Sequence, residues 1–402
     1  MRNRNIFREH RAGSAGFTLV ELLVAMAIFM VIGGAGIALL AQHQPIFNQQ
    51  QNLAEVNIAL RNAVAQMQID IGNAGANYYP TVNIPNYPVG VVITNHPVAT
   101  GGDCRTGSGT PKVYSTNCFD QMAIITADRN TLPAHPTTST GACPMSTAGA
   151  GNVTVYLAKD NNGAAASYGS GAAGLIAATT AAANYNYNGG TNPDQIFFVS
   201  NNGSKYTTAK LTAASTTGQI GGNYYVVLTI GGTSTSTPGL NTVTNDPYNM
   251  STTDNGMLSD SYQCTDWVLR LTPILYKVDT STDPNNPTLL RQVATLSQTT
   301  AQQTLATQVI GFKVGAVLFE GGTSDSPTYC FDSSQYDTNC LSPASPPSYK
   351  YNYTVVRSVM VSLVGRTNPN PAPTYVFRNT FDGGPYEVQG VSVVINPRNM
   401  SF

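Results

Sequence analysis

The sequence predicts an α+β protein in which a long N-terminal helix packs, by its second half, on a β-rich and mainly antiparallel head. Three observations predict this. Residues 17–41 form one apolar run, residues 53–71 repeat apolar side chains at helical spacing, and the rest of the chain alternates Val, Ile, Tyr and Phe-rich segments with Gly, Pro, Asn and Asp. No series of crossover helices separates these segments, so antiparallel sheets are favoured over a parallel α/β sheet.

The composition indicates an extracytoplasmic protein. Of 402 residues, 42% are hydrophobic and only 10% are charged, and 20 Lys and Arg face 21 Asp and Glu. Typical soluble domains carry about 25% charged residues. A net charge of −1 argues against nucleic-acid binding, which needs a concentrated basic surface.

The first 41 residues combine a basic segment with an apolar one. Four arginines and one glutamate precede the apolar run (Arg2, Arg4, Arg8, Arg11 and Glu9), which gives 4 − 1 = +3 and favours a cytoplasmic N-terminus. Residues 17–41 would span roughly 37 Å as a helix, enough to cross a bilayer core of about 30 Å. The obvious cleavage feature, Ala15-Gly16, precedes this run, so cleavage there would leave the helix on the mature chain.

Glu21 is a carboxylate inside this apolar run. Such a group in a membrane is expensive and usually has a partner. Cleavage after Gly16 would give Phe17 a free α-amine one helical turn away, in the same chain or in a neighbouring subunit. A tolerated charge at the membrane edge is the alternative explanation.

The string from Gly16 to Glu21, continuing LLVAMAIF, resembles the class III signal of type IV prepilins and pseudopilins. The resemblance implies that a prepilin peptidase cuts after Gly16 and methylates the amine of Phe17. It also implies that Glu21 neutralises the amine of an adjacent subunit during filament assembly. A buried membrane charge is tolerable where the assembly supplies its counter-charge.

The helix is expected to continue beyond the membrane, with a kink or interruption at Pro45. Apolar residues then recur at spacings of three and four, which marks one helical face: Leu53, Val56, Leu60, Val64, Met67 and Ile71. Gly72 and Gly75 are expected to end it. The chain is thus divided into a leader (1–16), a transmembrane helix (17–41), an amphipathic helix (42–75) and a head (76–402).

Ten segments of the head are expected to form strands: Val89–Thr94, Asp120–Ala127, Asn152–Ala158, Asp194–Ser200, Asn223–Ile230, Trp267–Val278, Val309–Phe319, Tyr353–Gly365, Tyr375–Phe381 and Glu387–Ile395. Residues 130–193 are dense in Ala, Gly, Ser, Thr and Asn and carry only Lys159 and Asp160 as full charges. Much of this segment is therefore expected to be long surface loops inserted between strands.

The C-terminal third carries a second resemblance. Tyr276-Lys277-Val278 followed by Leu289-Leu290-Arg291 resembles the Y-x-V … L-x-R hairpin of PilW-type minor pilins and of J-type pseudopilins of type II secretion. Residues 309–314 fit the strand that follows, and residues 357–366 resemble the R-x-V-x-V-x-L-x-x-R strand of the same proteins. Residues 80–260 resemble no family.

The six cysteines favour disulfides in an oxidising compartment rather than a metal site, because no pair has Cys-x-x-Cys spacing. They are Cys104, Cys118, Cys143, Cys264, Cys330 and Cys340. Six cysteines allow 15 pairings, and the loops 104–118 and 330–340 are the natural local candidates.

Motifs for enzymatic chemistry are weak, and no cofactor is expected. Gly169-x-Gly171-x-x-Gly174 matches a dinucleotide fingerprint, but no strand leads directly into it. His96 and His135 lie in Pro-rich sequence and are expected on the surface.

One turn holds a weak Ca²⁺ candidate made of Asp279 and Asp283 with Asn285 and Asn286, although a solvated turn is the better explanation. Tyrosine is abundant (21 residues), and clusters such as Tyr185 with Tyr187 or Tyr224 with Tyr225 suit contact surfaces or half-buried strand positions.

These resemblances imply a filament protein without enzymatic activity: a minor pilin that primes or caps a type IV pilus, or, as the alternative, a J-like minor pseudopilin. Its implied partners are other major and minor pilins or pseudopilins, the prepilin peptidase, the inner-membrane assembly platform and the lipid bilayer. The implied location is the inner membrane, crossed once with the N-terminus in the cytoplasm, and then the pilus or periplasmic pseudopilus. A membrane-anchored extracytoplasmic enzyme is a remote alternative.

Overall fold

A computed structural model describes most of the helix and the sheets of the head. The described residues are 18–76, 90–94, 105–106, 113–115, 118–146, 153–185, 195–201, 206–231, 261–293, 301–319, 325–328, 356–369, 377–380 and 383–398. Internal contacts divide the chain into two units, Met1–Ala54 and Glu55–Phe402. Each unit is described separately.

Helix α1 (Leu19–Gly72) is 54 residues long and contributes to both units. The helix passes through Pro45 without a break, so an interruption there, one of the two outcomes expected from the sequence, does not occur. In the first unit, every side chain described between residues 19 and 54 is exposed or only partly buried. No described residue of this unit covers the apolar surface of residues 19–41.

In the second unit, α1 buries the face that the apolar spacing predicted. Leu60, Val64, Met67 and Ile71 are at most 7% exposed, and they share a core with residues of the strands. Gly365 makes the close approach possible, because a Cβ there would lie only 3.0 Å from Val56 Cγ1. The helix ends at Gly72, and Gly75 follows with a φ of +72°, a conformation that favours glycine.

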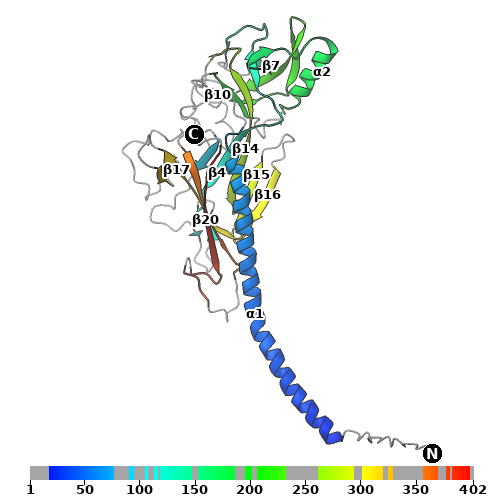
Figure 1. The fold of residues 1–402 in the computed structure, drawn as a ribbon, viewed down its shortest axis with the longest axis vertical. Helices are drawn as coiled ribbons and strands as arrows, with labels where there is room; N and C mark the ends of the chain where they lie inside the picture. Colours follow the sequence, from blue (N-terminus) through cyan, green and yellow to red (C-terminus); the bar gives the residue numbers. More distant parts are fainter. Residues whose placement is uncertain are drawn as a thin grey trace, which may run out of the picture. The chain divides into compact units, whose positions relative to one another are not determined.

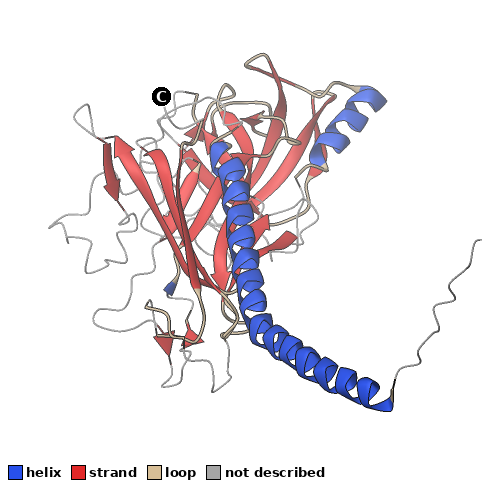
Figure 2. Ribbon diagram, turned by 60° about the horizontal axis from the view of Figure 1, so that its bottom comes forward, coloured by secondary structure: helices blue, strands red, loops and turns tan. Residues whose placement is uncertain are grey.

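The head is built from antiparallel pairs throughout the described strands, as the sequence predicted (Figures 1 and 2). Its longer strands are β1 (Val91–Thr94), β4 (Gln121–Ala127), β5 (Ala134–Thr137), β7 (Val153–Asn161), β9 (Gln195–Val199), β10 (Tyr206–Leu211), β11 (Thr216–Ile220), β12 (Asn223–Gly231), β14 (Trp267–Asp279), β15 (Thr288–Val293), β16 (Ala301–Ala306), β17 (Val309–Phe319), β18 (Asp325–Thr328), β19 (Val356–Arg366) and β20 (Val388–Ile395). Shorter ones are β2 (Arg105–Thr106), β3 (Val113–Tyr114), β6 (Met145–Ser146), β8 (Ala164–Ala166) and β13 (Ser261–Tyr262).

Strand β14 belongs to two parts of the head. Its second half pairs with β4 and β15, and this sheet, a four-stranded sheet (β18-β17-β19-β20) and α1 enclose one core. Its first half pairs with β5 and β9, and the order β14-β5-β7-β12-β10-β9 returns to β14. These six strands close into a ring around a second core. We call the ring, with β8, β11 and helix α2 (Gly171–Ala182), the barrel lobe; β7, β10 and α2 mark it in Figure 1.

The expectation of loops over much of residues 130–193 was wrong. This segment supplies β5, β6, β7, β8 and α2. Helix α2 buries Gly174, Ala178 and Ala182, which follow one another at four-residue spacing and so form one face. It packs on β11 and β12. Small side chains along one face let a helix approach a sheet closely. In the sequence, however, such a run of Ala and Gly resembles a low-complexity segment.

The strand expected at Tyr375–Phe381 is not seen in residues 377–380; the other residues of that segment lie outside the described part of the chain.

Candidate functional site

Glu21 and Thr18 exchange hydrogen bonds at the start of α1. Thr18 precedes the first helical residue, and its backbone N–H donates to Glu21 Oε2 at 2.9 Å. In return, the Glu21 N–H donates to Thr18 Oγ1 at 3.3 Å, and the Thr18 hydroxyl donates to the same carboxylate at 3.0 Å. This reciprocal pattern is a capping box, which satisfies N–H groups at a helix start. A carboxylate here also faces the positive end of the helix dipole.

The capping box gives the Glu21 carboxylate a local role, because it satisfies a backbone N–H at the start of α1. Sequence reasoning assigned Glu21 to an amine partner and missed Thr18, although the Thr-x-x-Glu spacing signals a capping box. Gly16 and Phe17 lie outside the described residues, so cleavage and methylation at these positions stay predictions.

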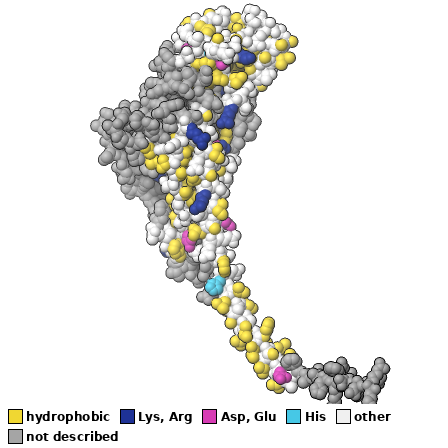
Figure 3. Space-filling model, viewed as in Figure 1, with side chains coloured by type: hydrophobic (Ala, Val, Ile, Leu, Met, Phe, Trp, Pro, Cys, Tyr) yellow, Lys and Arg dark blue, Asp and Glu magenta, His cyan; other side chains and the backbone are white. Residues whose placement is uncertain are grey.

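The helix behind this box is long and apolar enough to cross a membrane. Leu19–Ala41 has a mean hydropathy of 2.5 over its best window, and none of that window is buried. At about 1.5 Å per residue, its 23 residues span about 34 Å. Figure 3 shows hydrophobic side chains over the visible face of this part of α1.

A buried ionic cluster joins the last turn of α1 to the β14–β15 hairpin. Asp70 is 6% exposed and accepts from Arg291 Nε at 2.6 Å and from Arg291 Nη2 at 3.1 Å. Tyr276 donates its hydroxyl to Asp70 Oδ2 at 2.5 Å. Burial, with the Asp70 charge beside it, raises the pKa of Tyr276, which therefore acts as a donor at neutral pH.

This cluster gives the Y-x-V … L-x-R pattern a physical meaning. Tyr276 and Arg291 are direct cross-strand partners in the hairpin, and both bind the same carboxylate of α1. Sequence reasoning found the tyrosine and the arginine but missed Asp70, which lies on the apolar side of the helix, one residue before Ile71.

One disulfide is fully described. Cys143 and Cys264 join with a Cα–Cα distance of 5.7 Å across 121 residues, and link the segment after β5 to the segment before β14. Cys118 is also disulfide-bonded. Cys104, Cys330 and Cys340 lie outside the described part of the chain, so the local pairs 104–118 and 330–340 stay predictions.

The turn that suggested Ca²⁺ satisfies its carboxylates internally. Asp279 accepts from the Ser281 hydroxyl at 2.6 Å, the Thr282 hydroxyl at 2.7 Å and the Ser281 N–H at 3.0 Å. These bonds, that of the Ser281 hydroxyl first, lower the pKa of Asp279. Asp283 accepts from the Asn285 N–H at 2.9 Å. No group of three or more His, Cys, Asp or Glu suited to a metal occurs in the described parts of the chain.

The glycine triplet has an explanation in local packing. Contrary to expectation, a short strand, β8, ends just before it, and α2 begins at Gly171. β8 pairs antiparallel with β7, however, which is not the parallel βαβ setting of a dinucleotide site. A Cβ on Gly174 would lie 2.3 Å from the Gly169 carbonyl oxygen, so only glycine permits this turn.

The expectation that His135 lies on the surface was wrong. It is a β5 residue with 0% exposure. Its Nδ1 lies 2.9 Å from the Asp266 carbonyl oxygen and its Nε2 lies 3.4 Å from Asp160 Oδ1. Its ring lies 4.3 Å from that of Trp267. The prolines near His135 suggested a loop in the sequence. Pro136 is instead a buried residue of the same strand. His96 is outside the described residues.

Comparison with known proteins identifies the N-terminal segment. A family profile described as "Prokaryotic N-terminal methylation motif" matches residues 11–37. No curated protein matches the chain significantly. No solved structure matches it significantly. The matched residues contain Glu21 and most of the apolar span. The prepilin-type methylation motif, continued by an apolar N-terminal helix, supports membership of the type IV pilin and pseudopilin family.

Proposed function

We propose that the protein is a minor pilin of a type IV pilus, which primes or caps the filament after the prepilin peptidase has cut behind Gly16 and methylated Phe17. The observation that carries this proposal is the methylation motif at residues 11–37, whose residues from Leu19 onward form the start of the 54-residue helix α1. A structural rather than enzymatic role fits this motif.

The assembly step follows from the exposure of the helix. Residues 19–41 expose apolar side chains around the helix, including Phe29 at 77% and Leu40 at 72%. Lipid covers such a surface before assembly, and the helices of other pilin subunits cover it in a filament. The carboxylate of Glu21 then either keeps its box with Thr18 or pairs with the amine of a neighbouring Phe17.

The PilW-like assignment rests on the C-terminal pattern. Tyr276 and Arg291 hold Asp70 of α1, so the Y-x-V … L-x-R hairpin supports the helix that carries the subunit into the filament. The J-type pseudopilins of type II secretion share this pattern, which makes a minor pseudopilin the second candidate.

Mass spectrometry of filaments sheared from the cell surface, beside the membrane fraction, tests both proposals. We expect a peptide that begins at N-methylated Phe17 in the sheared filaments. The same peptide only in membranes would favour a short secretion pseudopilus. An intact Met1 leader in both fractions would overturn the prepilin assignment and favour a membrane-anchored enzyme or binding protein instead.

A further inference from the structure

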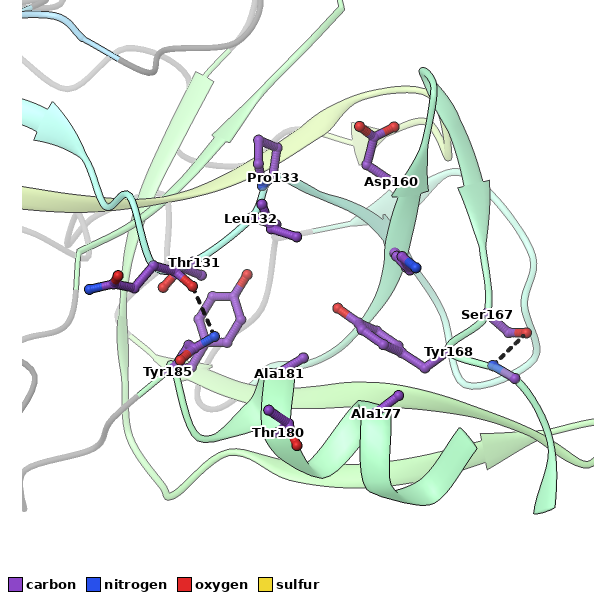
Figure 4. Close-up of a pocket in the computed structure, with 14 residues that line it drawn as sticks. Thr131, Leu132, Pro133, Asp160, Ser167, Tyr168, Ala177, Thr180, Ala181 and Tyr185 are labelled. Atoms are coloured by element: carbon purple, nitrogen blue, oxygen red, sulfur yellow. Dashed lines mark hydrogen bonds between the residues drawn. The ribbon is translucent and has the colours of Figure 1, made fainter. Parts of the chain in front are cut away.

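A cavity of about 580 Å³ opens in the barrel lobe between residues 130–133, the β7–β8 hairpin and α2 (Figure 4). Its volume lies within the range of small-molecule sites, about 300–1,000 Å³. The lining mixes apolar side chains, including Leu132, Pro133 and Ala181, with hydroxyl, amide and charged groups. Such a mixture is typical of sites that bind polar organic ligands.

Two tyrosines point into this cavity. Figure 4 shows the side chains of Tyr168 and Tyr185 directed into the space below Leu132 and Asp160. Tyr185 is 2% exposed, and its hydroxyl has no hydrogen-bond partner among the described residues. A buried hydroxyl without a partner is destabilising, and a hydrogen bond to a ligand would satisfy it. The tyrosine cluster noted in the sequence thus contributes a buried residue that lines a cavity.

Both tyrosines are donors at neutral pH. Burial raises the pKa of Tyr168 to about 12, and burial also raises the pKa of Tyr185. Their protonated hydroxyls can each donate one hydrogen bond and accept others.

Asp160 lines the same cavity, and in Figure 4 its carboxylate points away from the two tyrosines. Asp160 receives the Gly163 N–H at 2.7 Å, and His135 Nε2 lies at 3.4 Å. Both contacts use Oδ1, so Oδ2 can accept from a ligand. His135 is fully buried, and its Nδ1 contacts the Asp266 carbonyl oxygen. The contact with this fixed ring of β5 therefore holds the Asp160 carboxylate in place.

The charges around the site are balanced. Lys159 and Asp160 are the ionised residues of the cavity lining. A second cavity, of about 520 Å³, shares Thr131, Leu132, Pro133 and Asp160 with the first and adds Asp128 and Arg129. The two cavities together therefore carry two basic and two acidic side chains. An anionic or cationic ligand would find no net counter-charge.

Leu132 is an exposed apolar side chain that the two cavities share. It is 71% exposed and lines both of them. A ligand that fills both cavities therefore contacts Leu132 and needs an apolar face there.

We propose that the paired cavities bind a neutral oligosaccharide, with one sugar ring between Tyr168, Tyr185 and α2 and the next across Leu132. A sugar presents hydroxyl groups that both donate and accept, which matches two tyrosine hydroxyls and a carboxylate. Its C–H faces pack on aromatic and aliphatic side chains. A wholly apolar ligand would leave the Tyr185 hydroxyl and Asp160 Oδ2 without partners. This site extends the protein beyond filament assembly and does not depend on the proposed function.

Calorimetric titration of the full chain in lipid nanodiscs tests the proposal. The probes are neutral oligomers of glucose, galactose, mannose and N-acetylglucosamine, with polygalacturonate as the acidic comparison. We expect at least one neutral oligomer to bind and polygalacturonate to bind more weakly. Tyr185→Phe, which removes only the hydroxyl, is expected to weaken binding about three- to tenfold, the usual effect of one lost hydrogen bond.

Two further variants distinguish a loss of binding from a loss of folding. Asp160→Asn removes the charge at a part-exposed position and is expected to weaken the same probe by a similar factor. Tyr225→Phe, a half-buried tyrosine of β12 outside both cavities, is expected to bind like wild type. No binding of any neutral oligomer, a preference for polygalacturonate, or unchanged affinity in both Tyr185→Phe and Asp160→Asn would overturn the proposal.

Discussion

Residues 19–54 and 55–72 of α1 form one helix with opposite surroundings. In the first stretch, described side chains such as Phe29 and Ile32 are 77% and 66% exposed. In the second, Leu60 and Met67 are at most 1% exposed and share a core with the strands. The second stretch therefore finds its apolar partner within its own chain. The first stretch has no such partner among the described residues, and under the proposed function lipid or another subunit covers it.

The largest expected effect concerns the ionic cluster of the second stretch. Asp70→Ala leaves Arg291 and the Tyr276 hydroxyl without their acceptor, and breaking a buried ion pair costs about 3–5 kcal/mol. Urea unfolding of the full chain in detergent, followed by the fluorescence of the single tryptophan, Trp267, measures the loss. Gln68→Ala, on the exposed face of the same turns, is the control. Equal stability of the two variants would mean that the cluster does not anchor the helix.

Truncation of one apolar side chain in each stretch of α1 compares the two stretches most directly. Met67→Ala opens a cavity in a core position that is 0% exposed, at a cost of about 2–5 kcal/mol. Ile32→Ala removes a similar group from an exposed position and is expected to leave the unfolding of the head within about 0.5 kcal/mol of wild type. The same urea titration compares them. A large loss in Ile32→Ala would show that the head also supports the first stretch.

A smaller and local effect is expected at the start of the first stretch. Thr18→Val removes the hydroxyl that caps the Glu21 N–H, and loss of such a cap costs about 1 kcal/mol. Hydrogen exchange of the amides in the first turn should become about fivefold faster, while the urea midpoint of the head stays the same. Thr180→Val provides a control for the substitution itself, because the Thr180 hydroxyl bonds only the Ile176 carbonyl within α2. Unchanged exchange in Thr18→Val would mean that Glu21 is held by another group.

The smallest effect concerns a second carboxylate held by its own turn. The pKa of Asp279 is lower in the folded chain than in the unfolded one, chiefly because of the Ser281 hydroxyl. Its contribution to stability is therefore complete above the unfolded pKa of about 3.9 and is lost as the pH falls through the lower folded value. Asp279→Asn should flatten the acid limb of the unfolding free energy below about pH 4. Identical acid limbs would contradict the assignment.

The sequence was sufficient where one side-chain period decided the structure. The spacing of Leu60, Val64, Met67 and Ile71 predicted the buried face of α1, and the β-branched runs predicted β14, β17 and β20 within one or two residues. Partners far apart in the sequence could not be predicted: Asp70 meets Arg291 across 221 positions, and no local pattern marks such a pair.

The barrel lobe escaped prediction for a different reason. Its strand β8 is Ala-Ala-Ala and its helix α2 buries only glycine and alanine, while Leu175 and Ile176 of α2 are exposed. The buried faces therefore lack the large apolar residues on which periodicity depends. Closure of the ring also requires β14 to change partners along its length, which is a property of the sheet and not of one strand. For the same reason the cavity beside Tyr168 and Tyr185 could not be expected from the sequence, although both tyrosines were visible in it.

The most direct test of the account is to ask what covers the first stretch of α1 in the assembled filament. Phe29, which is 77% exposed, is replaced by the photoreactive analogue p-benzoylphenylalanine, and purified filaments are irradiated. We predict an adduct with the N-terminal helix of another pilin-type subunit, identified by mass spectrometry. Adducts with lipid alone, or with residues of the same chain's head, would contradict it.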